Sequence, residues 1–171
     1  FWVEAPEAGA DRAVIYALLD GESMTGAYQF HVYPSAETVV DVTATLFARR
    51  PINRLGLAPL TSMFFSGENE PRRLNEDFRP ELHDSDGLLL HTGAGEWIWR
   101  PVRNPQKSEM SAFVESSLRG FGLMQRDRAF EHYQDLDSEY HLRPGHGVEP
   151  REGFGEGRVE LVEIPTGHGI N

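Results

Sequence analysis

Residues 39–47 read VVDVTATLF, a run dominated by β-branched residues and closed by a phenylalanine. This composition predicts one long strand. The segment 13–19, AVIYALL, has the pattern of a buried strand and ends at the turn signal Asp20-Gly21. Residues 27–33 alternate between apolar and polar side chains, which predicts another strand. Shorter strands are expected at 1–3, 60–65, 88–91, 96–100, 111–114, 120–125 and 158–164.

Turn residues separate these segments, and short strands in such a series predict an all-β fold, an antiparallel β-sandwich. Helical periodicity is weak. Residues 126–140 could hold a turn or two of helix, and an irregular loop is almost equally well supported. Two long polar loops are expected, at 66–78 and 143–157. The 171 residues suffice for one domain or a large piece of one, and both ends read as if cut within a domain, so we expect an internal fragment.

Composition excludes several classes of function. Seventeen Gly and 11 Pro residues make up about a sixth of the chain, against roughly 12% in average proteins, which argues against a helical bundle. The net charge of −11 excludes a general nucleic-acid binder and opposes docking on anionic lipid. No apolar run approaches the roughly 20 residues of a membrane span. Without cysteine, the chain has no disulfide, no zinc–thiolate site and no thiol nucleophile.

The densest polar cluster is RPELHDSDG at residues 79–87. A carboxylate of Glu81, Asp84 or Asp86 could act as an acid or base, oriented by Arg79 or His83, and paired carboxylates are what glycoside hydrolysis requires. Alternatively, Asp84 and Asp86 simply cap a β-turn, since Asp bonds its own backbone two residues on. A calcium loop is a third reading, although the full twelve-residue pattern is absent.

A second cluster, GAGEWIWRP, spans residues 93–101. In a strand, Trp97 and Trp99 point to one face, with Glu96 and Arg100 on the other. Two tryptophans on one face can form a stacking platform for sugar rings, or they can belong to the core, where large aromatics usually lie. Glu96 and Arg100, on the opposite face of the strand, would then point either into a substrate-binding cleft or away from it.

The chain has seven histidines, none with the spacing of a metal site, and no cofactor is expected. His83 and His91 could meet on paired strands. The Gly-His-Gly triplets at 145–147 and 167–169 do not follow a strand as a nucleotide-binding loop would, and neither a P-loop nor a serine-nucleophile elbow is present.

Several motifs together resemble the osmoregulated periplasmic glucan biosynthesis proteins, the OpgG/OpgD (MdoG/MdoD) family. The resemblance covers essentially the whole chain. It is carried, in order, by FWVE at 1–4, IYALLD at 15–20, TGAY at 25–28, APLTSMF at 58–64, RPELHDS at 79–85, GEWIWRP at 95–101, GFGL at 120–123, DLD at 135–137 and VELVEIPT at 159–166.

The resemblance implies a galactose-mutarotase-like β-sandwich, of which residues 1–171 would be part, and a C-terminal immunoglobulin-like domain outside this chain. It also implies a periplasmic location, with the signal peptide outside the fragment, and a role in making glucans with a backbone of β-1,2-linked glucose. Some members of the family are inverting endo-β-1,2-glucanases. Expected partners are the β-1,2-glucan and the inner-membrane glucan synthase, with no nucleic acid and no membrane insertion. A non-catalytic protein that binds glucan and assists the synthase is the alternative.

Residue by residue, the resemblance makes Asp84, in the family's His-Asp-Ser motif, the general base. Arg79, Glu81 and His83 would orient Asp84 and set its pKa. Further sugar contacts are expected from Glu96, Trp97, Trp99, Arg100, Tyr140 and Arg143. The family's general acid follows the motif that is EIPT at 163–166 here, and by spacing it would fall immediately after Asn171.

Overall fold

A computed structural model describes residues 1–69 and 77–166. The chain divides into two compact units, Phe1–Leu57 and Ala58–Asn171. Both are built from antiparallel strands, and the predicted all-β fold is confirmed. No helix in the described part of the chain is long and apolar enough to cross a membrane.

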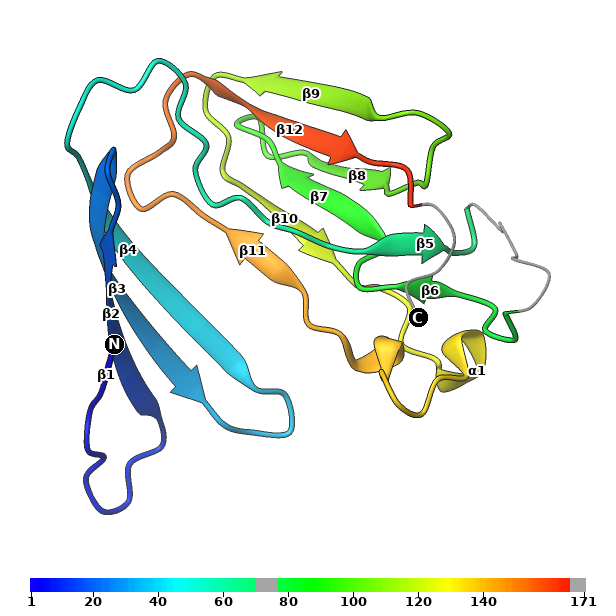
Figure 1. Ribbon diagram of the computed structural model, residues 1–171, viewed down its shortest axis with the longest axis horizontal. Helices are drawn as coiled ribbons and strands as arrows, with labels where there is room; N and C mark the ends of the chain where they lie inside the picture. The colour runs from blue at the N-terminus through cyan, green and yellow to red at the C-terminus, as the bar shows by residue number, and fades with distance from the viewer. Residues whose placement is uncertain (70–76, 167–171) are drawn as a thin grey trace. The chain divides into compact units, whose positions relative to one another are not determined.

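The first unit is one sheet of four strands in the order β1-β2-β3-β4 (Figure 1). The strands are β1 Trp2–Val3, β2 Ala13–Asp20, β3 Met24–Tyr33 and β4 Val39–Ala48. The Leu46 side chain of β4 packs over Gly26 of β3, because a Cβ at Gly26 would lie 2.7 Å from Leu46 Cδ2. All four strands predicted for this region are present.

The expected burial of residues 13–19 is wrong. Leu18 and Leu19 are neighbours on β2 and point to opposite faces, yet both are exposed, Leu18 by 66%. Within the first unit the four strands form a single layer, so no second sheet of the same unit packs on the apolar side chains of its faces.

The second unit contains a four-stranded sheet in the order β11-β10-β7-β8 and two two-stranded sheets, β12-β9 and β5-β6. Its strands are β5 Phe64–Ser66, β6 Leu82–His83, β7 Gly87–His91, β8 Trp97–Pro101, β9 Glu109–Glu115, β10 Gly120–Met124, β11 His146–Val148 and β12 Gly157–Glu163. One helical turn, α1 Phe130–Tyr133, and one 3-10 turn, η1 Tyr140–Leu142, lie between β10 and β11. The predicted turn or two of helix within 126–140 is therefore present.

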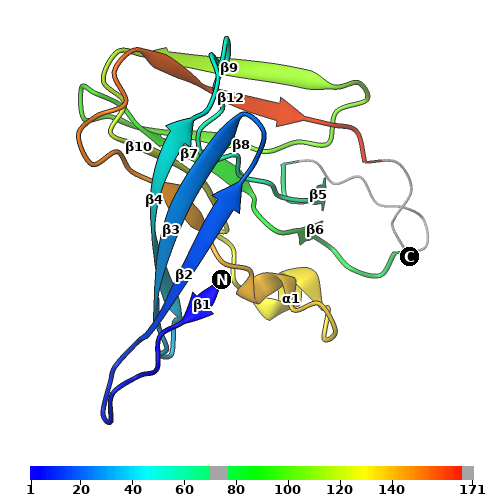
Figure 2. The ribbon, with the colours of Figure 1, turned by 60° about the vertical axis from the view of Figure 1, so that its left-hand side comes forward.

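The core of the second unit lies between two of these sheets. Leu88 and Leu90 of β7 share one buried cluster with Val159 and Leu161 of β12. Figure 2 shows β9 and β12 together as one layer beside β7 and β8. Side chains on the other face of β7 and β8 point away from this core, which makes them available to a functional site.

Two strands, β6 and β11, were not predicted. Residues 146–148 lie within an expected polar loop, but they pair with Leu123, Gly122 and Phe121 of β10. The backbones approach so closely that a Cβ at Gly122 would lie 2.2 Å from the His146 carbonyl oxygen. This pairing depends on glycine and on backbone hydrogen bonds, so it leaves no apolar alternation in the sequence. The expected meeting of His83 and His91 is also wrong, because His83 pairs with Phe64 and His91 with Trp97.

Candidate functional site

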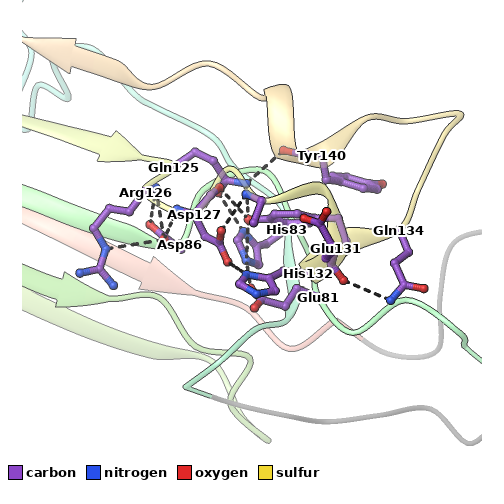
Figure 3. A network of polar contacts seen from close by, with 12 residues as sticks. Glu81, His83, Asp86, Gln125, Arg126, Asp127, Glu131, His132, Gln134 and Tyr140 are labelled. Carbon is purple, nitrogen blue, oxygen red and sulfur yellow. Dashed lines mark hydrogen bonds and ion pairs between the residues drawn. The ribbon is translucent and has the colours of Figure 1, made fainter.

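A buried polar network surrounds His83, which β6 places fully inside the second unit (Figure 3). His83 Nε2 lies 2.9 Å from Glu81 Oε2, and Nδ1 lies 3.0 Å from Gln125 Oε1. The imidazole stacks on Phe64, with 5.3 Å between ring centroids, and meets the edge of the Tyr133 ring at 5.2 Å. Every face and edge of the His83 ring is therefore in contact with protein.

Gln125 fixes the proton on this histidine. Its Nε2 donates to the Tyr133 hydroxyl at 2.6 Å and to the Tyr140 carbonyl at 3.0 Å, so its Oε1 must accept from His83 Nδ1. Burial raises the pKa of the Tyr133 hydroxyl, which stays neutral and donates to the Asp127 carbonyl at 3.2 Å.

Asp84 directly follows His83 in the chain, but its carboxylate lies in a different environment. The Asp84 N–H donates to the Met63 carbonyl at 2.8 Å, and the Met63 N–H donates to Asp84 Oδ2 at 3.2 Å. Arg143 Nε lies 3.2 Å from Asp84 Oδ1, and the side chains of Asp84 and Arg143 are 34% and 40% exposed. The carboxylate is thus fixed by the backbone and still open to solvent.

Tyr140 completes this cluster, because the Arg143 guanidinium lies 4.9 Å from the centroid of its ring. The turn η1 begins at Tyr140, and Arg143, which directly follows the turn, contacts both the Tyr140 ring and Asp84. Three predicted site residues from two distant segments, Asp84, Tyr140 and Arg143, therefore lie together. The arrangement offers a carboxylate, a cation and an aromatic ring, which together can contact the hydroxyls and the apolar face of a sugar.

Arg79 belongs to a separate cluster. It donates from Nε and Nη2 to both oxygens of Asp77, at 2.9 and 2.7 Å, and from Nη1 to Asp135 Oδ2 at 2.9 Å. These bonds lower the pKa of Asp77 and raise that of Arg79. The pKa of Asp135 is also lowered, first by the hydrogen bond from the Ser138 N–H and then by Arg79. Arg79 thus joins the approach to β6 to the segment after α1 through these two carboxylates.

The Asp84-x-Asp86 pair does not form a turn of its own. Both oxygens of Asp86 accept from the Arg126 N–H, at 3.3 and 3.2 Å, and Oδ2 accepts from the Asp127 N–H at 3.4 Å. Asp84 binds Met63 and Arg143 instead. Since these oxygens engage donors from different segments, they do not converge as the ligands of a calcium loop would.

Trp97 and Trp99 lie on one face of β8, opposite His91 and Leu89 of β7. Trp97 is 61% exposed and stacks on His91, with 4.1 Å between ring centroids and 9° between planes. Trp99 covers Gly87 closely enough that a Cβ there would lie 2.0 Å from its Cζ2, and the Arg126 guanidinium lies 4.3 Å from its ring centroid. The two rings therefore face away from the core.

Glu96 and Arg100 do not join this face. Glu96 lies in the exposed turn between β7 and β8, where its N–H donates to Thr92 Oγ1 at 3.0 Å. Arg100 shares the core face with Leu88 and donates from Nη2 to the buried Glu163 at 2.9 Å. Arg100 thereby connects β8 to β12.

The end of the EIPT motif is anchored, because the Thr166 N–H donates to Asn104 Oδ1 at 2.9 Å. His168 and the position expected for a general acid lie outside the described residues. Gln125 and Tyr133 were missed as members of the site. Tyr133 showed only helical spacing with Phe130, and Gln125 only ends an apolar strand, so neither carried a chemical signal.

Comparison with known proteins gives a consistent result. The family model "Periplasmic glucan biosynthesis protein, MdoG" matches residues 1–171. The chain belongs to the MdoG family. The resemblance drawn from its motifs is thereby confirmed. Among curated MdoG-family proteins, "Glucans biosynthesis protein G" of Ralstonia nicotianae is 55% identical over 97% of this chain and 33% of the relative.

Two further relatives agree with this assignment. "Glucans biosynthesis protein G" of Sodalis glossinidius is 53% identical over 100% of this chain and 33% of its own length. "Probable glucans biosynthesis protein D" of Shewanella oneidensis is 52% identical over 97% of this chain and 31% of its own length. The chain therefore spans about a third of the length of these MdoG-family relatives.

Proposed function

We propose that this chain contributes to periplasmic glucan biosynthesis as the part that acts on the glucan, with Asp84 as the general base of an inverting β-1,2-glucanase. The observation that carries the proposal is the state of Asp84. Its carboxylate is held by the Met63 N–H, remains 34% exposed, and contacts Arg143, whose guanidinium lies over the Tyr140 ring. By contrast, Glu81 is buried against His83 and cannot reach a polymer without rearrangement.

The chemistry assigns each group one task. In inverting hydrolysis a carboxylate base takes a proton from water, which attacks the anomeric carbon, while a second carboxylic acid gives its proton to the leaving oxygen. The two carboxyl groups stand roughly 6.5–9.5 Å apart to admit the water. Asp84 supplies the base, and the acid is expected just beyond Asn171. Two carboxyl groups perform this reaction without a cofactor.

Recognition of the sugar would involve the residues around the base. Arg143 can donate to glucose hydroxyls, and the Tyr140 ring can stack on an apolar sugar face. Trp97, exposed and backed by His91, offers a second stacking surface on the face of β8 that points away from the core. Trp99 and the exposed Glu96 lie on the same hairpin as Trp97. The positions of Arg79 and Arg100 support structural roles beside this surface.

A glucan-binding protein that assists the membrane synthase without cutting is the second candidate. The contact between Asp84 and Arg143 favours it, because a carboxylate paired with arginine can serve as a hydrogen-bonding surface for hydroxyls without any proton transfer. Both candidates place the protein in the periplasm, as the family description indicates.

The experiment compares the full-length protein containing this chain with its Asp84→Asn variant on linear β-1,2-glucan, followed by proton NMR. Asp41→Asn, an exposed aspartate on β4, is the matched control. We expect α-anomeric ends from the wild type and the control, and at least a hundredfold slower release from Asp84→Asn. Calorimetry measures glucan binding by all three proteins.

Each outcome separates the two candidates. Binding without cutting by the wild type would reject the glucanase and favour the assisting role. Equal cutting by wild type and Asp84→Asn would keep the enzyme but remove Asp84 as its base. If neither binding nor cutting occurs, both candidates fail.

A further inference from the structure

Four metal-ligand side chains converge beside the buried network. Glu68 lies in the turn after β5, Glu81 just before β6, Asp127 in the segment before α1 and His132 within α1. Each offers one ligand atom, and these four atoms all lie within 4.8 Å of one another. We call Glu68, Glu81, Asp127 and His132 the four-ligand cluster.

The spacing is close to that of one coordination shell. Ligand atoms around one tetrahedral zinc ion, with bonds of about 2.0–2.2 Å, lie about 3.3–3.5 Å apart. The four atoms of the cluster lie within 4.8 Å of one another, so they need to approach by about 1.3 Å to share one zinc ion. Glu68 and His132 are exposed, so their side chains can rotate to close what remains of the gap.

The cluster brings three carboxylates together, and two of them already contact an imidazole. Asp127 Oδ2 contacts His132 Nδ1, and Glu81 Oε2 contacts His83 Nε2. In residues 1–69 and 77–166, none of the three carboxylates has an arginine or lysine as an ion-pair partner. A cation placed between them would be attracted by all three carboxylates.

Glu81 gives an independent indication of a ligand. Its side chain is only 9% exposed, and one carboxylate oxygen is fixed by His83, which Gln125 holds from behind. Metal-binding carboxylates are typically oriented in this way, by a hydrogen bond from a residue that does not itself touch the ion.

We propose that the four-ligand cluster binds one divalent transition-metal ion, with Zn²⁺ as the defining probe. The imidazole selects this class, because nitrogen ligands favour zinc and its neighbours whereas calcium and magnesium prefer oxygen alone. Binding replaces the contact between Asp127 and His132 by a bond from each to the ion. The ion then ties the turn after β5, the approach to β6 and α1 together. The proposal does not depend on whether the protein cuts glucan.

The test is calorimetric titration of Zn²⁺ into the chelator-treated, full-length protein. Glu68→Gln and His132→Ala are the informative variants, because both side chains are exposed and their loss leaves no buried group unpaired. Glu131→Gln, beside His132 on α1, and His146→Ala, an exposed histidine of β11, are the matched controls. We expect one Zn²⁺ per chain, and a loss of affinity of roughly tenfold or more in each informative variant alone.

X-ray absorption at the zinc edge supplies a second readout. A zinc coordination shell of one nitrogen and several oxygens would support binding by the four-ligand cluster. No stoichiometric binding would overturn it. So would equal affinity in Glu68→Gln, His132→Ala and the controls. Tight binding of Ca²⁺ with none of Zn²⁺ would reject the transition-metal assignment, and an equal loss in His146→Ala would show binding at exposed histidines instead.

Discussion

His83 and Asp84 are neighbours in sequence but have opposite environments. His83 points into the second unit, where Glu81 and Gln125 saturate both of its ring nitrogens. Asp84 points to a half-open site beside Arg143. Successive side chains of an extended backbone face opposite ways, so the rigid histidine on one side determines where the aspartate lies on the other.

Replacing Gln125 tests this support. Gln125→Leu removes the acceptor of His83 Nδ1 and the donor to the Tyr140 carbonyl, and each buried group left unpaired costs about 1–3 kcal/mol. We expect the free energy of unfolding, measured by urea denaturation, to fall by about 2–5 kcal/mol. Gln106→Leu, at an exposed position, is the control and should change it little. A variant as stable as the wild type would show that the network is not needed for the fold.

A separate prediction concerns Gly87. A Cβ added at this position would lie 2.0 Å from Trp99 Cζ2, so it would overlap the Trp99 ring. Gly87→Ala should push Trp99 out of its contact with Arg126, shift the tryptophan fluorescence and destabilise the protein by about 1–3 kcal/mol. Gly157→Ala is the matched control, since nothing lies within 4 Å of the added methyl group. Unchanged fluorescence in Gly87→Ala would mean that Trp99 does not rest on this glycine.

At the scale of elements, strands whose side chains follow a pattern typical of β-structure were predictable from the sequence. Strands that are held mainly by backbone hydrogen bonds were not. The runs at 13–19 and 39–47 carry their β-branched residues into β2 and β4. In contrast, β6 has two residues and β11 pairs a glycine with Gly122, so neither shows a periodic pattern. Such strands exist only because a neighbouring strand is already in place.

The candidate site divides in the same way. The cluster at 79–87 could be recognised by its density of charge, and the family resemblance singled out Asp84. The contact of Asp84 with Arg143 joins residues far apart in sequence, and no local spacing encodes it. Arg79 shows the converse, because its neighbours in sequence suggested a role beside Asp84 while its bonds go to Asp77 and Asp135.

The bonds of Asp135 predict a pH dependence for this element. Its pKa is lowered in the folded protein, by the Ser138 N–H first and then by Arg79. A lowered folded pKa means that the stabilisation is complete above the unfolded value, about 3.9, and is lost as the pH falls through the folded value. Asp135→Asn should therefore cost about 3 kcal/mol at pH 7, since it leaves Arg79 with one partner fewer.

Urea denaturation of wild type and Asp135→Asn from pH 7 down to pH 2 measures this dependence. The difference between the two proteins should shrink as the pH falls below about 4, because the wild-type carboxyl then loses its charge too. Asp137→Asn, at a neighbouring exposed position, should follow the wild type at every pH. A difference that stays constant with pH would show that the charge of Asp135 does not stabilise this segment.

At the scale of the whole molecule, the two units have equally regular sheets but differ in burial. In the first unit, β3 is hydrogen-bonded on both sides, yet Gly26 is its only buried residue. In the second unit, β7 and β10 are also paired on both sides, and most of their residues are buried, Leu90 with 1% exposure. Local stability follows buried apolar contact more than the number of backbone hydrogen bonds.

Hydrogen exchange separates these two contributions. Because β3, β7 and β10 are all central strands, their amides have the same kind of protection, and only burial distinguishes them. We expect the amides of β7 and β10 to exchange at least tenfold more slowly than those of β3, as read by mass spectrometry of peptides covering 24–33, 87–91 and 120–124. The edge strand β11 serves as the fast reference. Equal rates in β3, β7 and β10 would mean that both units open in one cooperative step, and the division into two units would then not extend to their stability.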